Sequence, residues 1–148
     1  MKLKLDKKFV PCEVFDGDEI YPNGIFHFNI TKIIEYISHN KDQFTLESID
    51  IKTTRYRWAA TLDEDTIKAA QISNPIILAE ISPERYNIID GNHRFERAFR
   101  EGKTEILGYK LKMHQHLKFL TTIDGYTTYV QYWNEKMKEI SKTMKAKN

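Results

Sequence analysis

Residues 86–95 read YNIIDGNHRF, and the spacing of the apolar residues changes within this stretch. The residues before Asp90 predict a buried strand, whereas Phe95 and Ala98 share one face of a helix. Gly91 stands between these two patterns and permits a sharp turn. The stretch therefore predicts a strand that passes through a glycine turn directly into a helix.

The first turn of this expected helix is suited to hold an anion. Backbone N–H groups at a helix N-terminus lack intrahelical acceptors, and the macrodipole adds positive potential there. His93 adds a donor, and Arg94 adds a planar guanidinium that matches phosphate oxygens. Asp90 is a candidate metal ligand, proton acceptor or helix cap. The alternative is an ordinary Asp-Gly turn followed by a solvated His-Arg pair.

The remaining elements are expected from periodicity and turn residues. Strands are expected at about residues 9–15, 46–58, 76–81, 86–90 and 105–113, and helices at about 30–37, 61–73, 92–101 and 125–145. Residues 22–24, Pro-Asn-Gly, predict a hairpin turn. Asn29 or Thr31 is expected to cap the first helix, and residues 61–64 have the spacing of a capping box.

Composition predicts one globular domain over residues 1–148. The chain has a mass of 17.5 kDa, 41% hydrophobic residues and a net charge of only +2, so no overall charge marks it as a nucleic-acid binder. Cys12 is the only cysteine, which excludes an internal disulfide and a cysteine-based zinc site. No apolar run approaches the roughly 20 residues of a membrane span, and we expect a cytoplasmic protein.

The sequence resembles the ParB/sulfiredoxin-like superfamily over about residues 46–112. The stretches that carry this resemblance are residues 74–78, 86–98 and 102–106. Partition proteins of the superfamily have a Gly-Glu-Arg-Arg-like turn after a similar strand, and sulfiredoxins have Gly-Cys-His-Arg. The turn here is most similar to the Asp-Gly-His-His-Arg-like turn of archaeal free-serine kinases. The resemblance implies an α+β fold, with a mixed sheet, flanking helices and, in this chain, a C-terminal helical extension.

The resemblance also implies a nucleotide at the turn. Gly91, Asn92, His93 and Arg94 would contact its phosphates, with Arg55 and Arg57 as secondary candidates or, equally, a solvated strand end. The nucleotide would be ATP, ADP or CTP, with Mg²⁺ held by Asp90.

Two features separate the chain from its relatives. Asn92 stands where sulfiredoxin chemistry requires a cysteine, so the chain is not a sulfiredoxin. No room follows residue 112 for the helix-turn-helix domain of partition proteins.

Phosphoryl transfer would need a general base and a metal ligand as well. Asp90 is the first candidate for both roles, and Glu96 is the second candidate base. Glu47 and Asp50 are further carboxylates that the sequence does not place within reach.

Two other patterns have structural and functional interpretations. His114 and His116 would face one side of a strand as a metal pair, but no third ligand is spaced to complete it, and surface histidines are the better interpretation.

An apolar stripe on the last helix predicts packing within the chain, or alternatively a homodimer or protein partner, through Tyr126, Tyr129, Trp133 and Met137. The opposite face carries Lys136, Lys138, Lys142, Lys145 and Lys147, which is typical of a solvated surface or of non-specific nucleic-acid contact.

Three functions are therefore open. The first is a nucleotide-binding domain that acts as a small phosphotransferase or nucleotide hydrolase. The second is a non-catalytic, DNA-associated accessory protein of a plasmid or phage. The third is a protein-binding module that acts through the C-terminal helix.

Overall fold

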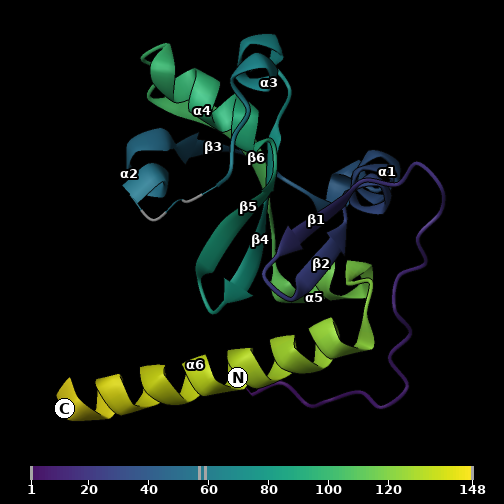
Figure 1. Cartoon of the computed structure of the whole chain (residues 1–148). Helices are drawn as coiled ribbons and strands as arrows, with labels where there is room; N and C mark the ends of the chain where they lie inside the picture. Colours follow the sequence, from purple (N-terminus) through teal and green to yellow (C-terminus); the bar gives the residue numbers. More distant parts are fainter. Residues whose placement is uncertain (1, 57, 59, 148) are drawn as a thin grey trace.

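The computed structural model describes residues 2–56, 58 and 60–147. At its centre lies a four-stranded sheet in the order β3-β6-β4-β5 (Figure 1). The strands are β3 (Leu46–Asp50), β4 (Ile76–Ser82), β5 (Arg85–Asp90) and β6 (Glu105–Leu111). β4 is antiparallel to β5 and parallel to β6, and β6 is antiparallel to β3. The chain is therefore an α+β protein with a mixed sheet, as expected.

β4 is the central strand, and all seven of its residues are buried. Successive side chains of a strand point to opposite faces of its sheet. Ile77 and Ala79 accordingly belong to one apolar core, and Ile76 and Leu78 belong to the other. Burial on both faces explains why this strand is a nearly continuous apolar run.

The first core lies between the sheet, a hairpin and two helices. The hairpin consists of β1 (Ile20–Asn23) and β2 (Phe26–Asn29), and the helices are α1 (Ile30–His39) and α6 (Ile123–Lys147). The expected hairpin turn is confirmed, because Asn23 pairs with Phe26. The Asn29 side chain caps α1 by accepting a hydrogen bond from the amide of Lys32.

Two short helices, α2 (Ile51–Tyr56) and α4 (Asn92–Arg100), contribute to the second core, and a third, α3 (Glu64–Ala69), packs against α4. The prediction of one strand over residues 46–58 was wrong beyond Asp50. The carboxylate of Asp50 accepts a hydrogen bond of 2.8 Å from the amide of Thr53, and the chain turns into α2 there. The expected capping box was also wrong, since Asp63 rather than Thr61 caps α3.

The segment before β1 runs without regular secondary structure, so the strand expected at residues 9–15 is not formed. It crosses the surface of the first core (Figure 1), and the amide of Cys12 donates a hydrogen bond to the carbonyl of Leu120. One such bond is not a strand ladder. The last core strand likewise ends at Leu111, earlier than expected, because a short helix, α5 (Met113–His116), follows it.

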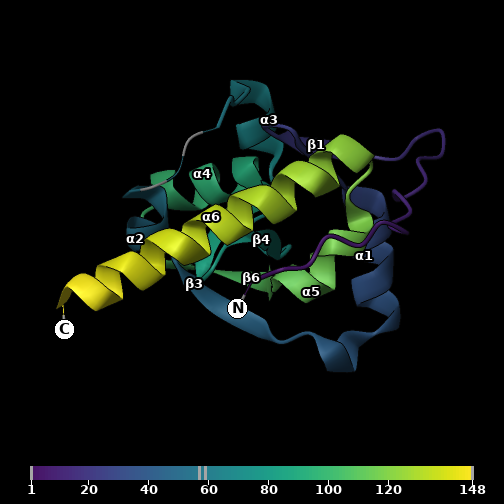
Figure 2. The same ribbon diagram turned by 90° about the horizontal axis from the view of Figure 1, so that it is seen from below.

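α6 crosses the first core and continues beyond it (Figure 2). Tyr126, Tyr129 and Trp133 are buried in this core, and Met137 packs at its edge. The interpretation of this stripe as intramolecular packing is therefore confirmed. A homodimer or protein partner bound through Tyr126, Tyr129, Trp133 and Met137 remains a prediction.

Among the described residues, no helix combines the length and the apolar character that a membrane span requires.

Candidate functional site

Gly91 adopts the conformation that the turn requires. Its φ is +94°, in the left-handed region that favours glycine. A Cβ at this position would lie 2.7 Å from Cγ2 of Ile76 and 2.8 Å from Nη2 of Arg94. Both the backbone angle and the space therefore require glycine between β5 and α4.

Within the part of the chain that the structure describes, no side chain caps the N-terminus of α4, unlike those of α1 and α3. Asn29 and Asp63 accept hydrogen bonds from first-turn amides of α1 and α3, whereas Gly91 has no side chain to do so. The positive end of the α4 dipole is therefore available to an external acceptor.

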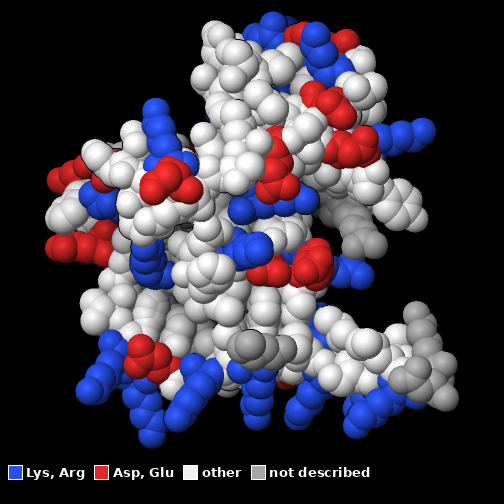
Figure 3. Space-filling view, turned by 180° about the vertical axis from the view of Figure 1, so that it is seen from behind, with Lys and Arg blue, Asp and Glu red and all other residues white. Residues whose placement is uncertain are grey.

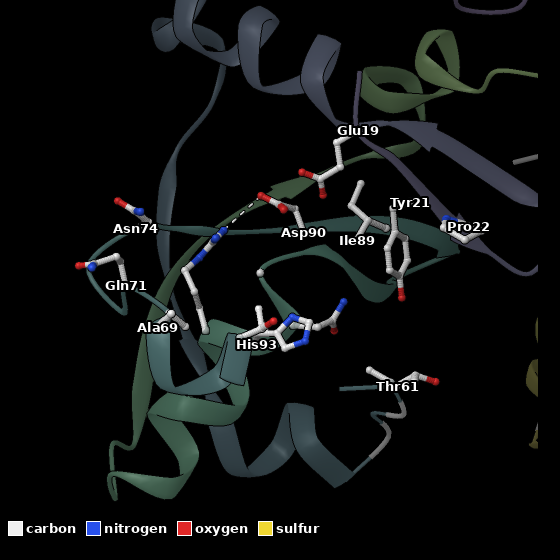
Figure 4. A pocket seen from close by; sticks show the side chains of 16 residues that line it. Glu19, Tyr21, Pro22, Thr61, Ala69, Gln71, Asn74, Ile89, Asp90 and His93 are labelled. Atoms are coloured by element: carbon white, nitrogen blue, oxygen red, sulfur yellow. Dashed lines mark hydrogen bonds and ion pairs between the residues drawn. The ribbon is translucent and has the colours of Figure 1, made fainter. Parts of the chain in front are cut away.

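This N-terminus opens on a pocket of about 610 Å³ (Figure 4). The turn at residues 91–94 forms one wall, and Glu19 and Tyr21 come from the start of the hairpin. The rest of the lining consists of Pro22, Ala60, Thr61, Thr66, Ile89, Asp90 and residues 69–71 and 74. The volume is within the range of small-molecule sites, which is roughly 300–1,000 Å³.

Arg94 lines this pocket but is partly engaged with the protein. Its Nη2 donates hydrogen bonds to the carboxylate of Asp90 over 3.1 Å and to the carbonyl of Pro75 over 3.0 Å. Nε is buried without a partner among the described residues. The contacts through Nη2 hold the guanidinium beside Gly91, and no described residue accepts from Nη1, which can donate to a ligand.

His93 is fixed by the neighbouring helix. Its Nε2 accepts a hydrogen bond of 3.1 Å from the backbone amide of Asp63, the cap residue of α3. A nitrogen that accepts a hydrogen bond carries no proton, so the neutral ring has its proton on Nδ1. His93 therefore links α3 to α4 and can offer Nδ1–H as a donor.

Asp90 is accompanied by a second carboxylate that the sequence did not reveal. The side chains of Glu19 and Asp90 lie close together in the pocket (Figure 4). Partial burial raises the pKa of the Glu19 carboxyl, the charge of Asp90 raises it further, and Arg94 opposes the shift. Glu19 is held in place by its backbone, since its amide donates to Oγ1 of Thr31 and its carbonyl accepts from the amide of Ile30.

The side chain of Asn92 binds another part of the protein rather than facing a ligand. Its Oδ1 accepts a hydrogen bond of 2.8 Å from Nε1 of Trp58, and the residue is buried. Its side chain therefore anchors the segment that leads to α3, and only its backbone remains for a ligand.

Glu96 and Arg55 lie together outside the lining of this pocket. The buried carboxylate of Glu96 pairs with Arg55 over 3.1 Å and with Arg100 over 2.8 Å. Arg100 also pairs with Glu64, and the Arg55 guanidinium lies over the ring of Phe99. This network joins α2, α3 and α4, so these two candidates stabilise the helices around the site. Arg57, the remaining candidate, lies outside the described residues.

His114 and His116 do not form the metal-binding pair on one face of a strand that was considered from the sequence. His114 and His116 lie in α5 rather than on a strand, and His116 is fully buried, so its interpretation as a surface residue was wrong. Nε2 of His116 lies 2.7 Å from the carbonyl oxygen of Glu80. Among the described residues, no group of three or more His, Cys, Asp or Glu side chains could hold a metal ion.

In sequence comparisons, the chain matches no protein-family model and no curated protein.

Proposed function

We propose that the chain is a ParB/sulfiredoxin-like domain that binds a nucleotide with its phosphates at the N-terminus of α4. The observation that carries the proposal is the left-handed Gly91 before an uncapped helix, opening on a pocket of about 610 Å³. A nucleoside di- or triphosphate fits this chemistry, because its phosphate oxygens accept from backbone amides and from guanidinium and imidazole groups.

The two carboxylates of the pocket fit a magnesium nucleotide. Mg²⁺ in nucleotide sites is commonly held by one or two protein carboxylates together with phosphate oxygens. Glu19 and Asp90 would supply the protein share of this ligand set. Mg²⁺ would neutralise phosphate charge beside them, and without it these carboxylates would repel the nucleotide.

If the nucleotide is turned over, the same pocket provides the groups for phosphotransfer or hydrolysis. A general base must accept a proton from the attacking hydroxyl or water. Glu19 would be the base only where Asp90 alone holds the Mg²⁺, because a carboxylate bound to the ion accepts a proton poorly. Asp90 is less suited as the base, since Arg94 already engages its carboxylate. Glu96 is not proposed as a base, since both of its oxygens accept from arginines.

Calorimetric titration with ATP, ADP, CTP and GTP, each with and without Mg²⁺, tests the proposal. We expect one nucleotide to bind, and to bind more tightly with Mg²⁺. Glu19→Gln should remove most of the Mg²⁺-dependent gain, whereas Glu35→Gln on the exposed surface of α1 should leave it unchanged. Release of inorganic phosphate, measured on the same samples, distinguishes turnover from binding.

A folded wild-type protein that binds none of the four nucleotides would overturn the proposal. Equal effects of Glu19→Gln and Glu35→Gln would remove Glu19 from the site.

A further inference from the structure

The N-terminal segment is fastened along α6 (Figure 2). The amide of Leu3 donates to Oδ1 of Asn134 over 2.7 Å, and Nδ2 of Asn134 donates to the carbonyl of Leu3 over 2.9 Å. The amide of Asp6 donates to the hydroxyl of Tyr126 over 2.8 Å. The bonds at Asn134 place Lys2 beside the lysines of the helix.

A groove of about 510 Å³ lies where the segment meets the helix. Its lining contains no acidic residue and consists of Lys2, Asn134, Met137, Lys138, Ser141, Lys142 and Lys145. The three helical lysines are spaced i, i+4 and i+7, which places them on one face of α6. The groove therefore gathers four ammonium groups from two ends of the chain.

The charge of the chain is strongly segregated towards this groove. Residues 1–8 contain four lysines and one aspartate, and residues 134–148 contain five lysines and two glutamates. These segments together carry +6, so the rest of the chain, with a total of +2, carries −4. Figure 3 shows the basic side chains in a row along the edge formed by α6 and the N-terminal segment. The small net charge of the whole chain conceals this asymmetry.

The last turns of α6 project beyond the core (Figures 1 and 2), and residues 138–145 are all exposed. The large apolar side chains on this part are only Ile140 and Met144. A helix that lies on a membrane needs a continuous apolar face with bulky residues, which this part lacks. Lysines near a helix C-terminus also complement its dipole, but this effect is confined to the last turn and involves no second segment.

We propose that this groove binds the phosphate backbone of double-stranded nucleic acid without sequence specificity. Lysine ammonium groups act as mobile point charges, which suits contact with successive phosphates rather than with base edges. The groove and the pocket at α4 share no lining residue. DNA binding at the groove can therefore be tested independently of nucleotide binding at the pocket.

Fluorescence anisotropy with a labelled, mixed-sequence DNA duplex tests this inference at salt concentrations from about 50 to about 200 mM. Each phosphate contact contributes about −0.9 to the slope of log affinity against log salt, so four lysines predict a slope of about −4. The groove variant Lys138→Gln/Lys142→Gln/Lys145→Gln should reduce the slope to about −1 and weaken binding at least about tenfold at low salt. Its control is Lys41→Gln/Lys52→Gln/Lys103→Gln, which removes the same charge from exposed sites elsewhere and should bind nearly as the wild type does.

Three results would overturn the inference. The first is no binding of the wild type at the lowest salt concentration. The second is an equal loss in both triple variants, which would indicate only a dependence on net charge. The third is tighter binding to vesicles containing phosphatidylserine than to DNA, with the same sensitivity to the groove variant, which would assign the groove to a membrane. Circular dichroism of each variant verifies that it is folded, as expected because all six lysines are exposed.

Discussion

The backbone amide of Asp63 donates its hydrogen bond to Nε2 of His93, so the cap residue of α3 and the first turn of α4 are joined directly. The same Asp63 accepts from the amide of Thr66 through its carboxylate. One residue thus both begins α3 and fixes a ring in the pocket. The position of His93 therefore depends on a helix that begins about 30 residues earlier in the chain.

Replacing His93 by alanine should separate these two helices locally. The loss of one hydrogen bond to a backbone amide is expected to lower the free energy of unfolding by about 1 kcal/mol. Nucleotide affinity should fall as well, because Nδ1–H is lost. Urea unfolding monitored by circular dichroism measures the first effect, and His114→Ala, at an exposed position of α5, is the control. A His93→Ala protein as stable as the control would contradict the link between α3 and α4.

Gly91→Ala should be much more damaging than Gly102→Ala. Both glycines have a positive φ, but a Cβ at position 91 would collide with Ile76 and Arg94, whereas one at position 102 meets no atom within 4 Å. We expect a loss of about 1–2 kcal/mol at position 102 from backbone strain alone. At position 91 overpacking should add about 1–3 kcal/mol. Chemical denaturation of the two variants side by side gives the comparison, and similar losses would show that the close approach beside Gly91 relaxes without cost.

Glu96→Gln tests the structural role of the ion-pair network. The buried carboxylate faces two arginines that both reach solvent, so we expect a loss of about 1–3 kcal/mol, less than for a fully buried pair. Glu64→Gln, at the exposed end of the network, should cost clearly less than Glu96→Gln, because exposed ion pairs contribute little. Nucleotide affinity, measured by calorimetry at a temperature where both variants are folded, should be unchanged. A loss of affinity with Glu96→Gln alone would return this residue to the binding site.

His116 should make the fold sensitive to mild acid. Burial lowers the pKa of His116 to about 4 from an ordinary value near 6.5. Between these pH values the unfolded chain binds a proton at His116 that the folded chain does not bind. The contribution of His116 to the free energy of unfolding is therefore fully present above about pH 6.5 and decreases as the pH falls towards 4. The decrease should reach about 3 kcal/mol.

Thermal unfolding from pH 7 to pH 4, together with NMR titration of the His116 ring, measures this effect. Below about pH 4 the loss should continue for a different reason. Hydrogen bonds to Asp18, Asp50 and Asp63 lower the pKa values of these carboxyls, and protonation removes this stabilisation. A His116 ring that titrates near its ordinary value in the folded protein would contradict the prediction.

The strand, glycine turn and helix of residues 76–100 were predictable because their signals are local. Apolar strand residues, a glycine and a helical period follow one another within 25 residues, and the hairpin turn and the Asn29 cap are equally local. The start of α2 also had a local signal, the Asp50 side chain three residues before Thr53, but the apolar pattern around it was interpreted as a strand.

Glu19 and His116 could not be predicted in this way. Glu19 reaches the pocket only because the start of α1 holds its backbone beside β5, far along the chain. His116 is buried because its ring lies against the carbonyl of Glu80 and the ring of Phe28, on two other elements. Their roles depend on contacts between segments that lie far apart in the sequence. The spacing of residues within one segment does not reveal such contacts.

Strand β4 has a consequence for how the molecule opens. It is buried along its whole length, hydrogen-bonded to β5 on one side and to β6 on the other, and shared by both cores. Its amides cannot meet solvent unless both cores separate, so we expect them to exchange their hydrogens only through global unfolding. The edge strand β3 and the short helix α2 can detach in smaller fluctuations and should exchange earlier. The two cores are thus a single cooperative unit, joined by strands that contribute residues to both, with β4 at the centre.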